Sequence, residues 1–287
     1  MSLEPRRPAV AGQFYPSDPS ALAHEIERCF TDPRGPGELP SPHRAPSRRV
    51  RAAIVPHAGY MYSGPIAAHA FARIARDRPP ASVLVLGVDH YGMSSGASLS
   101  DRAWLTPLGP TAVDHELVSA LARGPIVVDE AAHAREHSIE VELPFLEYVL
   151  PKPRFAALEV GFGPLDLLVE VAKVVREAVR ERDVLLIAST DFSHYVAPEK
   201  AQRLDRLALD AIEARSANRL YDTVLHHDIS MCGVAPVTVL LAATQDWPVT
   251  ARLLRWGHSG EAEPMRDVVG YGALVLETTE APPPPVK

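Results

Sequence analysis

The sequence predicts an α/β fold: a single domain with a mainly parallel sheet flanked by helices. Two observations predict it. Several segments are apolar along their whole length, as in RVRAAIV, SVLVLGV and VLLIAST, and they alternate with segments of helical periodicity. Strands that are apolar on both faces are typical of parallel sheets covered by helices on both sides. Because one large α/β core suits a chain of 287 residues, we treat residues 1–287 as one domain.

The first elements are a helix, a loop and a buried strand. Residues 18–30 have an amphipathic helical pattern that opens with an N-cap and an early proline, Ser-Asp-Pro. Cys29 lies on the apolar face of this pattern and is expected to be a small core residue. Residues 31–49 contain five prolines and are expected to form a loop. A strand over 49–55 and a helix over 65–77 follow.

The rest of the chain repeats this alternation. The expected strands cover 82–88, 154–162, 184–190, 250–256 and 268–277, and the expected helices cover 165–182, 199–215, 216–227 and 234–245. The sequence after residue 88 is rich in turn residues, and a helix is expected to begin at about His137. Residues 278–287 are rich in proline and are expected to be a flexible tail.

Composition excludes several classes of function. The net charge is −7, and the one basic cluster lies in the Pro-rich loop, so we expect no nucleic-acid partner. No apolar run approaches the roughly 20 residues that span a bilayer, and no signal-peptide core is visible, so we expect no membrane association. Two cysteines form no disulfide framework and fit a reducing compartment. These features predict a cytoplasmic protein.

Ionisable side chains follow the ends of three apolar strands. His57 follows the strand over 49–55, His90 follows the strand over 82–88, and Asp191 and His194 follow the strand over 184–190. In sheets of this kind, ligands bind beyond the carboxyl ends of the strands. The sequence therefore predicts that these side chains border one site.

Two of these residues could join a cysteine in a metal site. Neutral imidazole binds zinc, copper and iron, and thiolate is a softer ligand. Cys232 precedes the helix expected over 234–245, and a helix N-terminus is expected to lower the pKa of a thiol. We therefore hypothesise that His57, His90 and Cys232 bind one metal ion and leave positions open. The alternatives are hydrogen-bonded structural histidines and a cysteine that packs against the helix start.

Asp191 and His194 are candidates for proton transfer. They are three residues apart, and a carboxylate can orient an imidazole that acts as general acid or base. A turn cap and a loop histidine are the alternative interpretations. In the segment EHSIE, His137 is a further candidate for the pocket, whereas Glu140 fits a solvated face. His69 lies in an apolar helical pattern and is expected to be a packing residue.

Seven segments in order resemble the Memo family, whose microbial members are also called AmmeMemoRadiSam system protein B. They are AVAGQFYPSDPSAL, IVPHAGYMYSGPIAAHAF, VLGVDHYG, EHSIEVELPFL, STDFSHY, MCGVAPV and VVGYGAL. The resemblance implies a fold similar to the LigB-like class III extradiol dioxygenases, which use non-haem iron. It also implies that His57, His90 and Cys232 match the family's metal-ligand positions, with Asp191, His194 and His137 in the same pocket. The microbial name implies a functional link to AMMECR1-like and radical SAM proteins.

Three functions are compatible with this site. The first is a dioxygenase-like oxidoreductase that uses iron, or copper, as its cofactor, with His194, Asp191 and His137 as the catalytic candidates. The second is a zinc-dependent hydrolase on the same residues, since zinc also accepts three protein ligands and a water. The third is a binding or scaffold protein that retains the pocket without catalysis. Its ligand would be a small molecule or a peptide.

Overall fold

Four parallel strands form the centre of the fold. The computed structural model describes residues 4–41 and 45–278. The central strands are β1 (Val50–Val55), β2 (Ser82–Val88), β7 (Arg154–Val160) and β8 (Val184–Ser189), in the spatial order β7-β2-β8-β1. All four are apolar segments that the sequence predicts as buried strands. Because β8 lies between β1 and β2, the carboxyl ends of these three strands meet at one place on the sheet edge.

Further strands, some of them antiparallel, extend this centre on both sides. Beyond β1 lie β10 (Gly270–Thr278) and then β9 (Val249–His258). On the other side, β7 pairs in parallel with β5 (Gly109–Val113) and antiparallel with β3 (Ala97–Ser100). Two short strands complete this edge, β4 (Trp104–Thr106) beside β5 and β6 (Ile126–Val128) beside β3. The sheet is therefore mixed: its centre is parallel, as predicted, and both of its sides include antiparallel pairs. The short strands β3 to β6 were missed because none has a long apolar run.

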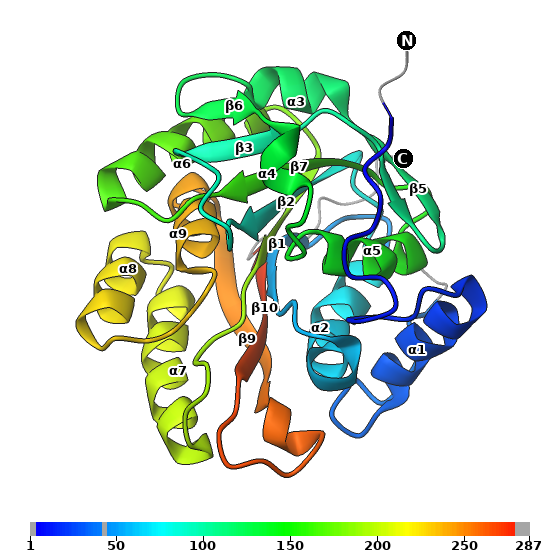
Figure 1. Ribbon diagram of the computed structural model, residues 1–287. Helices are drawn as coiled ribbons and strands as arrows, with labels where there is room; N and C mark the ends of the chain where they lie inside the picture. Colours follow the sequence, from blue (N-terminus) through cyan, green and yellow to red (C-terminus); the bar gives the residue numbers. More distant parts are fainter. Residues whose placement is uncertain (1–3, 42–44, 279–287) are drawn as a thin grey trace.

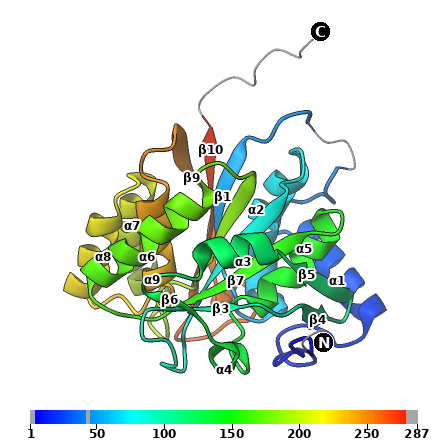
Figure 2. The ribbon, with the colours of Figure 1, turned by 90° about the horizontal axis from the view of Figure 1, so that it is seen from above.

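Helices cover both faces of the sheet, so the molecule has three layers (Figure 1). One face carries α1 (Pro19–Thr31), α2 (Tyr60–Ala75) and α5 (Leu143–Val149), and the other carries α3 (His115–Leu121), α6 (Leu165–Val179), α7 (Pro198–Glu213), α8 (Ala217–His226) and α9 (Val234–Ala243). Along β1, Ala53 and Val55 pack towards the first group, and Ala52 and Ile54 towards the second. Figure 2 shows the same two layers on either side of the strands. Every residue of α9 is buried, since α9 lies between the sheet and the outer helices.

Helix α2 begins earlier than the sequence predicts and contains Pro65 in its interior. A proline there has no N–H to donate to the carbonyl four residues before it, that of Met61. The Arg34 guanidinium donates to this Met61 carbonyl at 3.1 Å. The helix tolerates Pro65 because a side chain from the Pro-rich loop replaces the lost hydrogen bond. His69 of the same helix is part-buried and bonds through Nε2 to the Arg34 carbonyl at 3.0 Å, as expected for a packing residue.

The helix expected from about His137 begins later. A turn precedes the 3-10 helix η1 (Glu140–Glu142), which continues into α5. The expectation that Glu140 lies on a solvated face was wrong: Glu140 is buried in an ion pair with Arg6, 2.7 Å between Nη1 and Oε2. Two short elements, α4 (Glu130–His133) and the 3-10 helix η2 (Ser259–Glu261), complete the described elements.

The two segments predicted to be irregular have different outcomes. The described residues 32–41 and 45–49 of the Pro-rich loop form no helix or strand, as expected. The tail predicted over 278–287 lies outside the described residues except for Thr278, which ends β10 and pairs with Val249. Within the part of the chain that the structure describes, no helix has the length and apolar character needed to cross a membrane.

Candidate metal centre

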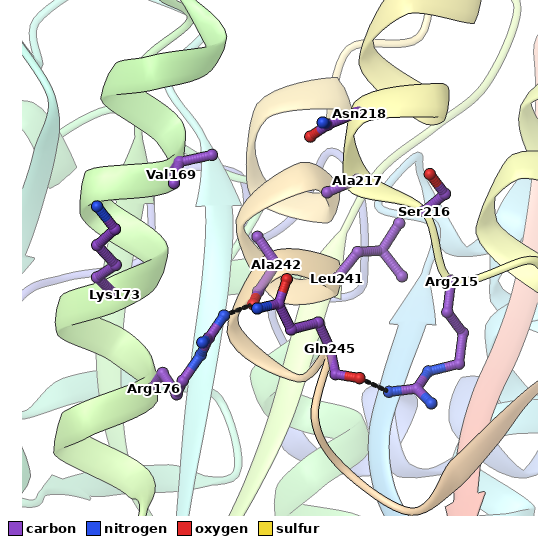
Figure 3. A pocket seen from close by; sticks show the side chains of 10 residues that line it. All are labelled: Val169, Lys173, Arg176, Arg215, Ser216, Ala217, Asn218, Leu241, Ala242 and Gln245. Atoms are coloured by element: carbon purple, nitrogen blue, oxygen red, sulfur yellow. Dashed lines mark hydrogen bonds between the residues drawn. The ribbon is translucent and has the colours of Figure 1, made fainter.

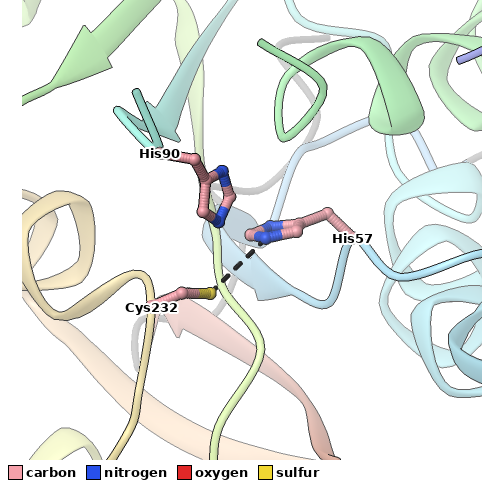
Figure 4. Close-up of side chains that lie close together, drawn as sticks. All are labelled: His57, His90 and Cys232. Atoms are coloured by element: carbon pink, nitrogen blue, oxygen red, sulfur yellow. Dashed lines mark hydrogen bonds between the residues drawn. The ribbon is translucent and has the colours of Figure 1, made fainter. Parts of the chain in front are cut away.

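Three potential metal ligands converge from three separate segments. His57 follows β1, His90 follows β2, and Cys232 lies in the loop before α9. One ligand atom from each residue lies within 4.8 Å of the other two (Figure 4). The strand order explains the convergence, because β1 and β2 flank β8 and their side chains meet over its carboxyl end. The predicted grouping of His57, His90 and Cys232 is therefore present in the structure.

The donor atoms have the spacing that a metal ion requires. Nε2 of His57 lies 3.4 Å from Sγ of Cys232. In a tetrahedral zinc site, with metal–nitrogen distances near 2.1 Å and metal–sulfur distances near 2.3 Å, such donors are about 3.6 Å apart. Two imidazoles and one thiol also form a donor set that suits first-row transition metals. The residues present fit a mononuclear metal ion.

The imidazole of His57 is buried and fixed on its non-ligating side. Nδ1 lies 2.7 Å from Oγ of Ser189, and the backbone N–H donates to Asp191 Oδ1 at 3.0 Å. Burial, together with the neighbouring His137 and His90, lowers the pKa of His57 well below its usual range. His57 is therefore neutral, which is the form that binds a metal through a nitrogen lone pair.

A buried carboxyl group continues this contact. Ser189 Oγ donates to Glu142 Oε1 at 2.9 Å, so His57, Ser189 and Glu142 form a chain of hydrogen bonds. Glu142 is fully buried, and this burial raises its pKa well above the usual range of a glutamate. If Ser189 donates to Glu142, its oxygen accepts from Nδ1–H of His57, and Nε2 then carries the lone pair that faces Cys232. We call these three residues the His57–Ser189–Glu142 chain.

His90 is held by a carboxylate of its own. Its side chain is partly exposed, and Nδ1 lies 3.0 Å from Oε1 of Glu136. Glu136 also accepts from the backbone N–H groups of His90, His137 and Ser138. Burial alone would raise the pKa of Glu136, but the hydrogen bond from His90 and these N–H groups hold it well below its usual range. A carboxylate that orients the far nitrogen of a ligating histidine is a regular feature of metal sites.

His137 lies in the same cluster, as predicted from its segment. Its ring stacks on His90 with centroids 4.7 Å apart, and it packs edge to face on His57 at 5.4 Å. On its other side it contacts the ring of Phe14 at 4.9 Å. Although His90, Glu136 and His137 also lie close enough to surround an ion, the Glu136 oxygens are already occupied by N–H groups. We therefore assign Glu136 to positioning rather than to ligation.

Phe14 belongs to an N-terminal segment that braces this side of the site. Glu140 accepts hydrogen bonds from the Ala9 and Val10 backbones, from Tyr15 Oη and from Arg6. Arg6 also donates to the carbonyls of His133 and Glu136. Residues 6–15 are thereby fixed against residues 133–140, next to the positioning carboxylate.

The thiol of Cys232 departs from the sequence expectation. Its position ahead of α9 predicts a lowered pKa, but burial and the nearby Asp191 carboxyl raise it well above the usual thiol range. The cost of burying a charged thiolate raises the pKa more than the N-terminus of α9 lowers it. The backbone N–H of Asp191 donates to Sγ at 3.2 Å, which favours the thiolate once a cation is present. Binding of a metal ion to Cys232 therefore requires the release of its proton.

Asp191 and His194 lie at the site but are oriented separately. Asp191 bonds the His57 backbone, and burial raises its pKa to about 6. Nδ1 of His194 lies 2.7 Å from the carbonyls of both Phe192 and Ser230, so it carries the proton and leaves Nε2 free. We expected Asp191 to orient His194, but in the structure the carbonyls of Phe192 and Ser230 orient it.

Comparison with known proteins identifies the family. The model of the Memo-like protein family matches residues 6–275. A MEMO1 family protein of Methanopyrus kandleri is 40% identical over 279 residues, which cover 94% of this chain and 98% of that protein. One of Methanothermobacter thermautotrophicus is 41% identical over 276 residues, covering 94% and 99%.

The chain belongs to the Memo family. This confirms the resemblance on which the site prediction drew. A solved structure of an uncharacterized Escherichia coli K12 protein shares the fold of this Memo-family protein, with a TM-score of 0.50 and 14% identity over 78% of this chain and 99% of that chain. Ser189 and Glu142 were not predicted as functional, and Glu136 was named only as a member of the candidate segment EHSIE. Ser189 had a signal, since it is the last residue of a buried strand, two positions before Asp191.

A cavity of about 470 Å³ in this Memo-family protein lies away from the candidate metal centre, between α6, α8 and α9 (Figure 3). Its cationic side chains have structural partners. Arg176 donates to the carbonyl of Ala242, and Arg215 donates to those of Thr244 and Gln245. These arginines satisfy carbonyls at the C-terminal end of α9, where a positive charge is favourable. We therefore assign them to helix capping.

Proposed function

We propose that this Memo-family protein is a metal-dependent oxidoreductase whose mononuclear centre consists of His57, His90 and Cys232 and holds iron. The observation that carries the proposal is the convergence of the three donor atoms within 4.8 Å. A site with three protein ligands leaves room for a further ligand, as in catalytic rather than structural sites. The related set of two histidines and a carboxylate binds non-haem iron in oxygenases.

The metal would supply redox chemistry and polarise a bound ligand, and the surrounding residues have separate tasks. Glu136 orients His90, and Ser189 with Glu142 orients His57, so that each imidazole presents one nitrogen to the centre. Asp191, with a pKa near 6, is suited to accept or return a proton close to neutral pH. His194 offers its Nε2 at the same strand end, while the stacked rings of His90 and His137 limit movement on the other side.

Metal analysis tests the ligand assignment. The untagged protein, purified from its native host, is compared with His57→Ala and Cys232→Ser by mass spectrometry of bound metals. His69→Ala is the matched control, because His69 lies on the helix that follows His57 and bonds a backbone carbonyl instead. We expect about one iron per chain in the parent and the control and a loss of metal in both site variants. Unchanged metal content in His57→Ala and Cys232→Ser would refute the assignment.

A zinc hydrolase is the second candidate, since two histidines, one cysteine and an open position are also a zinc donor set. Reconstitution separates the two. Metal-free protein is loaded with iron, copper or zinc, and oxygen consumption is measured with a reductant present. Consumption with iron or copper, absent in Cys232→Ser, supports the oxidoreductase. Stoichiometric zinc from the native host, with no consumption under any loading, would contradict it.

A further inference from the structure

A pocket lined mainly by apolar side chains opens directly onto two of the proposed ligands. This apolar pocket has a volume of about 340 Å³, and His90 and Cys232 are part of its wall. Most of the wall consists of buried aliphatic side chains: Val88, Val160, Val224, Ile229, Met231 and Val234. These side chains come from the ends of β2 and β7, from α8, from α9 and from the loop between the two helices. The pocket is therefore built mainly by regular elements of the fold.

Two large apolar side chains stand exposed at the same pocket. Phe162 is 66% exposed and Leu225 is 51% exposed. Phe162 is held in place, because its ring stacks on Tyr221 with centroids 6.4 Å apart and an angle of 15°. The Tyr221 hydroxyl in turn donates to the Gly163 carbonyl at 3.0 Å. A fixed aromatic ring left in water beside an apolar cavity is a surface that a bound apolar group would cover.

The charges at the pocket select against anions. Among the described residues that line it, the charged ones are Asp89 and Asp228, and none is a lysine or an arginine. Asp89 accepts hydrogen bonds from the backbone N–H groups of Met93 and Ser94, which keeps its carboxylate in place. In the metal-free protein, a carboxylate or phosphate in this pocket would therefore face negative charge without a cationic partner.

We propose that the apolar pocket binds the body of a neutral small molecule of one or two rings, with its polar group directed towards His90 and Cys232. The volume lies at the lower end of the roughly 300–1,000 Å³ typical of small-molecule sites, which sets the size. The aliphatic wall and Phe162 bind the body, and in the metal-free protein the two aspartates disfavour anionic analogues. The orientation of the ligand's polar group towards His90 and Cys232 rests on the proposed metal centre. The binding of its apolar rings in the pocket does not.

Two fluorescent probes with the same ring system test this inference. Binding of 2-naphthol, which is neutral at pH 7, and of 2-naphthoate, which is anionic, is measured by fluorescence titration of the metal-free protein. We expect at least tenfold tighter binding of 2-naphthol. Ile229→Trp, which fills the pocket, should abolish binding, and Phe162→Ser, which changes an exposed side chain, should weaken it about fivefold. Leu207→Trp, on the exposed side of α7, is the matched control and should bind as the parent does.

Equal affinities for the two probes, or 2-naphthol binding that survives both Ile229→Trp and Phe162→Ser, would overturn the inference. Measurement of iron uptake by separate aliquots of each protein, after incubation with iron and removal of the unbound metal, separates it from the proposed function. Protein that binds metal but not 2-naphthol refutes the pocket alone. Protein that binds 2-naphthol but no metal supports the pocket and refutes the metal centre.

Discussion

The substitution Ser189→Ala would interrupt the His57–Ser189–Glu142 chain at its middle. It removes one oxygen atom and leaves two buried groups without their partner, Nδ1 of His57 and Oε1 of Glu142. Each buried polar group that loses its hydrogen bond costs about 1–3 kcal/mol. For two such groups we therefore expect the free energy of unfolding to fall by roughly 2–6 kcal/mol. Since His57 also loses the acceptor that fixes its tautomer, metal affinity should fall by about 10- to 100-fold.

Titration with Co²⁺ measures the second effect, because coordination by the Cys232 thiolate gives a charge-transfer absorption. Chemical denaturation measures the first. Ser82→Ala is the matched control: Ser82 is also a buried serine of a central parallel strand and donates to the Arg154 carbonyl, but it begins β2 at the opposite end. The control should lose about 1 kcal/mol and keep its Co²⁺ affinity within about twofold.

The variant Glu142→Gln then separates the orientation of His57 from other effects of the Glu142 carboxyl group, because its amide oxygen can still accept from Ser189. A decrease in Co²⁺ affinity in Ser189→Ala but not in Glu142→Gln assigns the effect to the tautomer of His57. A decrease in both assigns part of it to the carboxyl group of Glu142. If Ser189→Ala binds Co²⁺ as tightly as the Ser82→Ala control, the chain does not position His57 and the reasoning is refuted.

Three further predictions concern stability and the backbone. Glu159 is buried beside the Glu136 and Asp89 carboxylates, with its pKa raised to about 10. In the unfolded chain the pKa of this glutamate is about 4.3. Between about pH 4.3 and pH 10 the native state therefore binds one proton more than the unfolded state. The free energy of unfolding should fall as pH rises through this range, by up to about 1.4 kcal/mol per pH unit. Denaturation from about pH 5 to pH 9 should show this slope, flattened in Glu159→Gln; equal slopes would contradict it. Arg6→Met leaves the buried Glu140 without its cation and should cost about 3–5 kcal/mol in thermal or chemical unfolding, and a loss below about 1 kcal/mol would show that the ion pair is dispensable. In Gly233→Ala the new Cβ would lie 2.3 Å from Cβ of Thr190, so the Cys232 loop must move; we expect a loss of about 1–3 kcal/mol and of Co²⁺ binding, and parental Co²⁺ affinity would disprove this.

The sequence carried enough information to predict the sheet centre and the grouping of the candidate ligands. The strands β1, β2 and β8 are apolar throughout, and His57, His90 and Asp191 follow their ends within a few residues. Parallel strands deliver their carboxyl ends to one edge, so a local pattern predicted a contact between distant residues. Cys232 was the weaker inference from pattern, because it follows no strand; the family segments supplied its assignment.

The positioning residues could not be predicted in the same way. Glu142 lies in ELPFL, where it could equally lie on the exposed face of a helix, and only the 3-10 helix η1 turns it towards Ser189. The raised pKa of Cys232 depends on how completely other segments cover it, which a position ahead of a helix does not reveal. Glu140 was misassigned for the same reason, since its partner Arg6 is 134 positions away.

The position of β1 between β8 and β10 has a consequence for how the protein matures. Both neighbours of β1 lie far along the chain, at Val184–Ser189 and Gly270–Thr278, so the strand that precedes His57 stays unpaired until residues up to Ser189 have been synthesised. Contacts between such distant segments form late and make folding slow. A nascent chain on the ribosome can offer His57 and His90 only as isolated side chains. On the proposed metal centre, an ion would therefore bind only after β8 and β10 have paired with β1, and its identity would reflect the metal available at that stage of folding.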